Sequence, residues 1–312
     1  MRRRSLLPLL ALPAAALGAR WATARPRPGA PYLAGAPLLM AHRGGADLAP
    51  ENTLLALERA VAWWAADVLE IDVQPTRDGE AVVIHDETLD RTTDGTGWVA
   101  AHTLAEIQCL DAGYRFSPDG GQSFPFRGRG VRVPTLGEVL DAFPGVRVNV
   151  EIKDGRAQEA VWRAVHRRRA SQRVLIAAAR RANRTHFREY SGAVSASEEE
   201  LKSFYAHHVL RAGALYHPPV DAFQMPERYG GVQVLSRRFI RTAHQKNVAV
   251  HVWTVDAEAD MRRLLEWGVD GVVTNRPDRL ARVLHEVAGR PLPPGPPEGV
   301  AEPFLERLLR AG

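Results

Sequence analysis

The chain has 312 residues, of which 45% are apolar, so it can bury a sizeable core as one large barrel or as two ordinary domains. Four of its five net positive charges come from one end, because four arginines and no acidic residue lie among the first 24 residues. Without that segment 37 basic residues face 36 acidic ones. This balance excludes a general affinity for polyanions, and we expect no nucleic-acid partner.

The first 24 residues have the three parts of a signal peptide. Three arginines give a basic start, an apolar stretch with two prolines follows, and "ATA" at residues 22–24 offers small residues at the spacing of a cleavage site. The apolar stretch is short for a membrane span, which needs about 20 residues. We therefore expect residues 1–24 to direct export, to the periplasm or out of the cell. The alternative is an uncleaved segment that anchors the chain, which is the one membrane contact we expect.

The segments that flank the main part of the chain are rich in proline. Residues 25–37 are predicted to be a tether, and residues 289–312 a tail with one short helix that docks on the main body or, alternatively, binds a partner. Cys109 is the single cysteine, so no disulfide forms within the chain.

Between these segments, short apolar runs alternate with helix-like segments, which is the pattern of a parallel sheet with crossover helices. Eight runs are predicted as strands: 38–42, 67–73, 146–152, 173–179, 192–196, 220–224, 248–254 and 270–274. The fifth and sixth runs carry the weakest pattern. Eight strands in about 250 residues is the size of a (β/α)8 barrel, so we predict an α/β fold of the TIM-barrel type over residues 38–288.

One interval breaks this rhythm. Residues 85–136, between the second and third strands, are rich in glycine, proline and aromatic residues. An insertion of this length at the end of a barrel strand commonly forms a lid or a wall of the functional site.

Carboxylates stand near the ends of two strand runs, where a barrel has its mouth. Glu70 and Asp72 alternate in an otherwise apolar run, so both point to one side of the strand, and Glu151 ends the next run. Buried carboxylates this close repel each other unless a cation lies between them. The three residues therefore predict an oxygen-rich site for Ca²⁺ or Mg²⁺.

Histidines and cationic side chains accompany these carboxylates. His42 and Arg43 end the first run, His85 opens the insertion, and Lys153 follows Glu151 at a spacing of two. Two histidines supply a general acid and a general base, and the cations supply hydrogen-bond donors for a phosphate. Each residue alone could have a structural role, such as an ion pair or a turn. Their joint occurrence at successive strand ends indicates phosphodiester chemistry.

Three further features have open interpretations. Gly44 and Gly45 let the backbone approach a ligand closely. Asn52 either begins a helix or orients the catalytic loop. Trp253, after the seventh strand, either packs at the rim or forms the wall of a pocket for a small polyol or a lipid headgroup.

Several longer stretches resemble the glycerophosphodiester phosphodiesterase family. They are "AHRGG" with "PENT", "LEIDVQPTRDGEAVVIHDETLDRTTDGTG", "VNVEIK" and "VHVWTVD" with "GVDGVVTNRPDRL", and they extend over nearly all of residues 38–288. The resemblance implies a (β/α)8 barrel and metal-dependent hydrolysis of a small-molecule glycerophosphodiester to sn-glycerol 3-phosphate and an alcohol. Position by position, it implies acid/base roles for His42 and His85, a divalent metal held by Glu70, Asp72 and Glu151, and a phosphate near Arg43 and Lys153.

The resemblance leaves other functions open. Some relatives act on lysophospholipids, and this chain departs from the family at Asn275 and in the alanines that end the fourth strand, which affects the expected substrate pocket. A barrel of the phosphatidylinositol phospholipase C type also pairs two histidines but accounts less well for the three carboxylates. A barrel that binds a ligand without turning it over is the alternative from another functional class.

Overall fold

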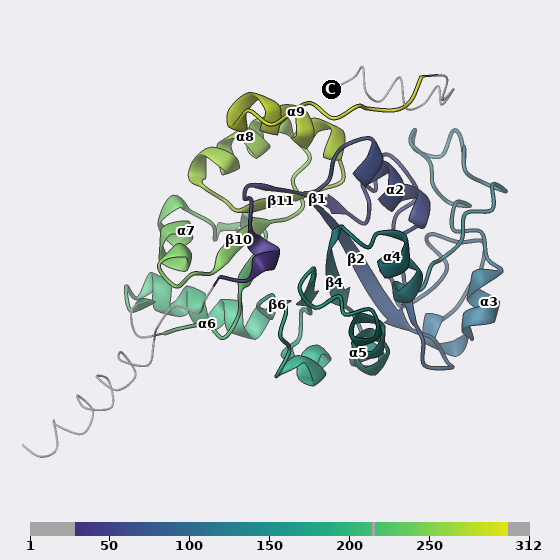
Figure 1. Ribbon diagram of the computed structural model, residues 1–312, viewed down its shortest axis with the longest axis horizontal. Coiled ribbons are helices and arrows are strands. Elements are labelled where there is room, and N and C mark those ends of the chain that lie inside the picture. Colours follow the sequence, from purple (N-terminus) through teal and green to yellow (C-terminus); the bar gives the residue numbers. More distant parts are fainter. Residues whose placement is uncertain (1–28, 214–215, 299–312) are drawn as a thin grey trace, which may run out of the picture.

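The computed structural model describes residues 29–213 and 216–298 (Figure 1). In this part of the chain eight parallel strands follow one another around a barrel. They are β1 (Leu38–His42), β2 (Val68–Pro75), β4 (Arg147–Ile152), β5 (Val174–Ala177), β6 (Ala193–Val194), β7 (Ala222–Met225), β10 (Ala249–Val252) and β11 (Gly271–Thr274). Each overlaps one of the predicted runs, and the predicted TIM-barrel class is confirmed.

Helices cover the outside of these strands, as Figure 1 shows. They are α2 (Leu54–Ala62), α4 (Leu136–Ala142), α5 (Gln158–Arg167), α6 (Glu198–Val209), α7 (Arg237–His244), α8 (Glu258–Trp267) and α9 (Pro277–Ala288), with the 3-10 helix η4 (Arg181–Phe187) between β5 and β6. Thr53, Thr135 and Ser197 begin α2, α4 and α6, each accepting a backbone N–H bond on its side-chain oxygen. These caps satisfy N–H groups that have no partner inside the helix.

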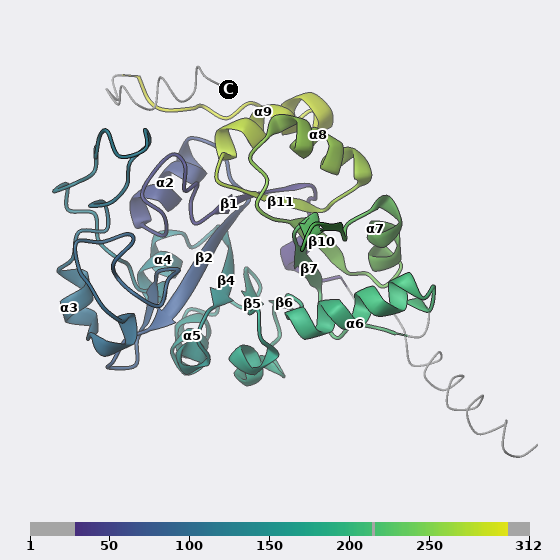
Figure 2. The same ribbon diagram turned by 180° about the vertical axis from the view of Figure 1, so that it is seen from behind.

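The barrel closes between β6 and β7. Hydrogen-bonded neighbours run in the order β6-β5-β4-β2-β1-β11-β10-β7. A parallel bridge between Ser195 and Ala222 joins the two ends, and the N–H of Ala196 donates to the carbonyl of Ala222 at 2.9 Å. Figure 2 shows α6 beside both strands at this closure.

Alternate side chains of the strands face either the surrounding helices or the interior of the barrel. On β2, Leu69 and Ile71 pack in the cluster shared with the helices, whereas Val68 packs inside the barrel. Because successive side chains of a strand point to opposite faces, Glu70 and Asp72 also point inward. The interior of the barrel is therefore apolar at the amino ends of the strands and polar at their carboxyl ends.

The chain leaves the barrel after β2, as expected, and returns at α4. This insertion contains β3 (Ala81–Val83), which pairs antiparallel with β2, the 3-10 helix η2 (Val99–Ala101) and α3 (Leu104–Gln108). It has a small apolar core of its own, formed by Val82, Ile84, Leu89, Val99, Ile107, Ala112 and Val133. A second, shorter excursion after β7 forms the hairpin of β8 (Arg228–Tyr229) and β9 (Val232–Gln233).

The described part of the predicted tether closes the opposite end of the barrel. The 3-10 helix η1 (Pro31–Leu33) places Tyr32 in the interior cluster, against the first residues of β1 and β2. Arg147 donates to the carbonyl groups of Tyr32 and Ala34, at 2.9 and 2.7 Å. The amino-terminal end of the barrel is thus sealed, which leaves the carboxyl end for a site.

The predicted signal peptide at residues 1–24 and the predicted short helix near the end of the tail lie outside the described residues. Within residues 29–213 and 216–298, each helix is too short or too polar to cross a bilayer.

Candidate active site

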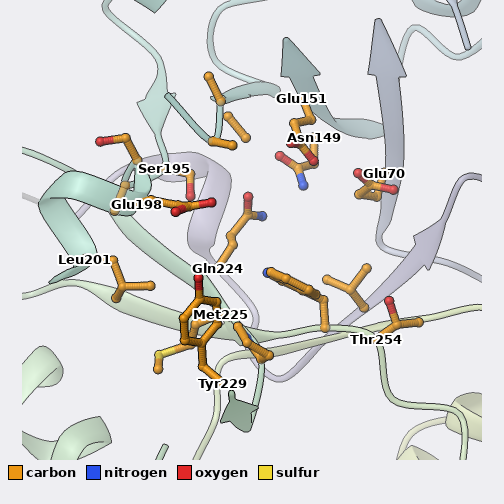
Figure 3. Close-up of a pocket in the computed structure, with 18 of the residues that line it drawn as sticks. Glu70, Asn149, Glu151, Ser195, Glu198, Leu201, Gln224, Met225, Tyr229 and Thr254 are labelled. Atoms are coloured by element: carbon orange, nitrogen blue, oxygen red, sulfur yellow. The ribbon is translucent and has the colours of Figure 1, made fainter. Parts of the chain in front are cut away.

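A cavity of about 670 Å³ opens at the carboxyl ends of the strands. Seven of the eight candidate residues line it: His42, Arg43, Glu70, His85, Glu151, Lys153 and Trp253. The eighth, Asp72, lies beneath them and is buried. Figure 3 shows Glu70, Asn149 and Glu151 facing Leu201, Met225 and Tyr229 from across the cavity.

Strand register brings the three carboxylates together. Glu70 pairs with His42 of β1, and Asp72 pairs with Glu151 of β4. One carboxylate oxygen from each of Glu70, Asp72 and Glu151 lies within 4.8 Å of the others. Residues from two separate stretches of the sequence thus converge because neighbouring parallel strands end at the same level.

Within the cluster, Asp72 and Glu151 form ion pairs with Lys153 or Arg43, whereas Glu70 does not. Lys153 Nζ lies 2.9 Å from Asp72 Oδ1 and 2.9 Å from Glu151 Oε2, and Arg43 Nε lies 3.1 Å from Asp72 Oδ2. Burial opposes the charge of Asp72, but Lys153 and Arg43 outweigh it and lower the pKa of Asp72. Glu70 instead faces His42 Nε2 at 3.9 Å and accepts the N–H of Arg43 at 3.1 Å.

Glu70 shows why this cluster fits a cation. Burial, followed by the charges of Asp72 and Glu151, raises the pKa of Glu70 well above its ordinary value. A carboxyl group held this way gains from a nearby positive charge. Three oxygen donors without a thiolate suit a hard divalent ion rather than zinc. The residues present therefore fit the divalent metal that the resemblance implies.

Asn52 orients the site as well as preceding helix α2. Its Nδ2 donates to Asp72 Oδ2 at 3.0 Å, and its Oδ1 accepts the N–H of Asp72 at 3.3 Å. The side chain of Thr53 provides the helix cap. Of the two roles open for Asn52, the structure thus gives it the orienting one.

Packing requires the two glycines after Arg43. Both have positive φ, 84° at Gly44 and 93° at Gly45. A Cβ atom at Gly44 would lie 2.8 Å from the backbone of Ala56 in α2, and one at Gly45 would lie 2.9 Å from Pro277 of α9. Only glycine fits where the turn presses against two helices.

His42 belongs to a hydrogen-bonded row that ends at Asp256. Its Nδ1 lies 2.6 Å from Asn275 Oδ1, and Asn275 Nδ2 donates to Asp256 Oδ2 at 3.0 Å. A carboxylate only accepts, so the amide nitrogen faces Asp256 and the amide oxygen faces the ring. His42 Nδ1 is therefore the protonated nitrogen of the neutral ring, and its Nε2 is a free base directed at the cluster. Burial and the charge of Arg43 lower the pKa of His42.

His85 has a different partner. Its Nδ1 lies 2.7 Å from Asp86 Oδ1, and Gln74 Nε2 donates to the carbonyl of His85 at 3.0 Å. Hydrogen bonds from Arg91, together with His85, lower the pKa of Asp86 to about 2, so this carboxylate stays charged. A carboxylate only accepts, so His85 Nδ1 donates to Asp86, and this hydrogen bond orients the His85 ring as Asn275 orients that of His42.

The wall opposite the carboxylates is largely apolar. It is formed by α6, the β8–β9 hairpin and the end of β7, and it includes Leu201, Tyr205, Met225, Tyr229 and Val232. Trp253 lies at the mouth with 45% of its surface exposed, as a wall residue rather than a core residue. The cavity thus offers charged groups on one side and apolar groups on the other.

Several residues of the site were not predicted as such: Asp86, Arg91, Asp256 and, as a partner of His42, Asn275. Asn275 directly follows the last strand, which is the position where a search for further site residues would find it. Asp256 follows β10 by four positions, and nothing in its local pattern distinguishes it from a surface residue. Asn149 also lines the cavity, and its buried Oδ1 has no hydrogen-bond partner among the described residues.

Two solved structures with a similar fold are a glycerophosphoryl diester phosphodiesterase domain and a glycerophosphodiester phosphodiesterase. The glycerophosphoryl diester phosphodiesterase domain of a protein from Mycobacterium tuberculosis superposes with a TM-score of 0.68, at 22% identity, over 80% of this chain and 99% of that domain. A glycerophosphodiester phosphodiesterase from Agrobacterium tumefaciens superposes with a TM-score of 0.62 at 28% identity, over 78% of this chain and 98% of its own.

Sequence comparison agrees with the fold. The glycerophosphodiester phosphodiesterase of Caldanaerobacter subterraneus subsp. tengcongensis is 35% identical over 263 residues, which are 80% of this chain and 98% of the relative. That of Bacillus subtilis is 34% identical over 267 residues, covering 79% and 86% of the two chains. Residues 42–279 match the model of the glycerophosphoryl diester phosphodiesterase family. The chain belongs to the glycerophosphoryl diester phosphodiesterase family.

Proposed function

We propose that the protein hydrolyses glycerophosphodiesters to sn-glycerol 3-phosphate and an alcohol, with a divalent metal, Ca²⁺ or Mg²⁺, held by Glu70, Asp72 and Glu151. The observation that carries the proposal is the convergence of these carboxylates, within 4.8 Å of one another, with two histidines at one cavity. The relatives named above are glycerophosphodiester phosphodiesterases, and a phosphodiesterase from Oleispira antarctica of the same fold holds sn-glycerol-3-phosphate as its product.

The two histidines take opposite roles in this proposal. His42, with a free Nε2 and a lowered pKa, is the general base that removes the proton from the attacking oxygen. His85, paired with the charged Asp86, is the general acid that gives a proton to the alcohol oxygen as its bond to phosphorus breaks. The proton count balances, because His42 gains one proton from the attacking oxygen while His85 gives one proton to the leaving alcohol.

The remaining charged residues bind the phosphate. Arg43 and Lys153 line the cavity beside the carboxylates, where their N–H groups can reach phosphate oxygens that gain charge in the transition state. When bound, a divalent cation would neutralise phosphate charge and make the phosphorus more electrophilic.

A lysophospholipid is the second candidate substrate, and the apolar wall favours it. Leu201, Tyr205, Met225 and Val232 offer an apolar chain a contact surface that a small alcohol does not need. The shared chemistry is the same phosphodiester bond. Cleavage of either substrate therefore tests the phosphodiester chemistry, and the preference between them tests the role of the apolar wall.

The test is release of sn-glycerol 3-phosphate from glycerophosphocholine by the purified chain that begins at Arg25, with chelator and then with Ca²⁺ or Mg²⁺ restored. Metal-dependent release supports the proposal. Cleavage of lysophosphatidylcholine alone supports the second candidate. Cleavage of inositol lipids alone, or metal binding without any hydrolysis, contradicts both.

A further inference from the structure

Arg91 joins the two halves of the site without lining the cavity. Its Nη1 and Nη2 donate to the two oxygens of Glu51 at 2.8 and 2.7 Å. Its Nε and Nη2 donate to the two oxygens of Asp86 at 2.6 and 3.1 Å. One guanidinium group thus holds two carboxylates, and both pairs are bidentate.

Each of these carboxylates holds a residue at the cavity. Glu51 Oε1 accepts from Arg43 Nη1 at 2.8 Å, and Asp86 Oδ1 lies 2.7 Å from His85 Nδ1. A continuous row therefore runs from Arg43 through Glu51, Arg91 and Asp86 to His85. Glu51 comes from the loop between β1 and α2, whereas Arg91 and Asp86 belong to the insertion, 35 to 40 positions further along the chain.

The row crosses from the barrel to the insertion at Arg91. Glu51 is mostly buried between the two arginines, with 15% of its side chain exposed, whereas 47% of the Arg91 side chain is exposed. An exposed ion pair alone contributes little to stability. Four well-aligned hydrogen bonds to two carboxylates instead fix the positions of both, which is what the planar guanidinium group does better than any other side chain.

We propose that Arg91 is a positioning residue, which through Asp86 and Glu51 sets at once the orientation of the His85 ring and the place of the Arg43 guanidinium group. The inference rests on the proposed function, since it concerns how that site is assembled. Without Arg91, Asp86 loses its anchor and its hold on His85 weakens. Glu51, in turn, keeps only its hydrogen bond with Arg43, and we expect the Arg43 guanidinium group to move toward Glu51 and away from the phosphate.

The experiment measures kcat and KM for glycerophosphocholine with Mg²⁺ or Ca²⁺ in the purified wild-type protein and in R91A, R91K and R77A. We expect the kcat/KM of R91A to be about 10- to 100-fold below that of the wild type, through both a lower kcat and a higher KM. Losses of this size are usual for residues that orient catalytic groups. Added millimolar guanidinium is expected to restore part of the activity of R91A in a saturable way, while the same ionic strength of sodium chloride does not. A residue with a merely structural role would not show this rescue.

R77A is the matched control, because Arg77 also bridges parts of the insertion, to Glu106 at 3.3 Å and to the carbonyl of Ala101 at 3.1 Å, yet does not line the cavity. Kinetics of R91A equal to those of R77A would overturn the inference, as would a folded R91A that guanidinium does not rescue. If R91A does not fold, R91K carries the test: one ammonium group cannot hold two carboxylates in two bidentate pairs, so wild-type kinetics in R91K would overturn the inference. A wild-type protein without turnover would overturn the proposed function and the inference with it.

Discussion

The amide oxygen of Asn275 lies 2.6 Å from Nδ1 of His42, and the amide nitrogen of the same side chain donates to Asp256. This relationship fixes the tautomer of the catalytic base that we propose, because an amide held by a carboxylate can turn only its oxygen to the ring. The neutral His42 ring thus carries its proton on Nδ1 and presents a bare Nε2 to the cluster.

The first prediction concerns the pH dependence of His42. Its pKa is lowered by burial and by Arg43, so the base remains unprotonated, and kcat/KM stays high, down to a pH below the ordinary histidine pKa of about 6.5. N275D puts a carboxylate beside the ring, which favours the protonated form and raises that pKa. The acidic limb of the kcat/KM profile should therefore move to higher pH in N275D. If the acidic limb did not move in N275D, His42 would not be the group whose titration produces it.

The second prediction concerns the need for both histidines. H42A and H85A should each lose about 10²- to 10⁴-fold in kcat while keeping the circular dichroism spectrum of the wild type, since general acid/base groups contribute that much. H186A is the control, because the His186 side chain is exposed, pairs with Glu159 at the surface and does not line the cavity. Near-wild-type turnover by either active-site variant would rule out the two-histidine assignment.

The third prediction follows from the raised pKa of Glu70. A carboxyl group with a raised folded-state pKa stabilises the fold below its unfolded pKa, and this stability is lost as the pH rises through the folded value. E70Q removes the buried charge, so in chelator at neutral pH its Tm should be higher than that of the wild type. With Ca²⁺ or Mg²⁺ added, the wild-type Tm should rise and that of E70Q should rise less.

E159Q is the control for that comparison, because Glu159 is exposed, pairs with Arg163 on the surface of α5 and is not part of the carboxylate cluster. It should keep the metal-dependent rise. If E70Q is less stable than the wild type in chelator, the account of Glu70 as a carboxylate awaiting a cation is wrong.

The fourth prediction concerns His251, which is fully buried inside the barrel. Burial lowers its pKa to about 4, and its Nε2 has no hydrogen-bond partner among the described residues. The unfolded chain takes up a proton near pH 6.5 and the folded chain does not, so stability is present above that pH and is lost as the pH falls toward 4. Between pH 7 and pH 5 this group should cost about 2 kcal/mol of unfolding free energy.

Urea unfolding at the two pH values tests this, with H251Q and H102Q compared with the wild type. H251Q should lose less stability on acidification than the wild type, because glutamine does not titrate. His102 is half-buried on the insertion, outside the barrel interior, so H102Q should follow the wild type. Equal pH dependence of all three proteins would show that His251 is not the titrating group.

The fifth prediction concerns the amino terminus. If residues 1–24 direct export, the mature protein recovered outside the cytoplasm of a bacterial host should begin near Arg25. Mass spectrometry of the intact protein measures this directly. A protein that keeps residues 1–24 and sediments with membranes would instead support the anchored alternative.

The sequence alone was sufficient to predict the barrel and the carboxylate cluster. Glu70, Asp72 and Glu151 could be found because carboxylates at alternate positions of an apolar strand are costly to bury and therefore indicate a site. Parallel strands of a barrel also bring their carboxyl ends to one level, which places the three residues together. Both predictions depended on regular periods in the sequence: the alternation of strands with helices, and the period of two along a strand.

The surroundings of the histidines could not be predicted in the same way. Arg91 and Glu51 are 40 residues apart in two irregular segments, and no period relates them. Asp256 is one of many acidic residues near helix starts. The reason for Gly44 and Gly45 also lay elsewhere in the chain, in α2 and α9, whose distance from the turn depends on the folded barrel. Long-range side-chain contacts between loops follow from the fold and leave little trace in local sequence.

The most direct test of the central claim is ³¹P NMR of glycerophosphocholine incubated with the purified protein, in chelator and with Ca²⁺ or Mg²⁺ restored, beside D72N. Asp72 is the buried member of the cluster and holds both Lys153 and Arg43. We predict that the phosphodiester signal is replaced by that of sn-glycerol 3-phosphate only when metal is present, and that D72N leaves it unchanged. Equal turnover in chelator, or by D72N, would contradict a metal held by these carboxylates as the basis of catalysis.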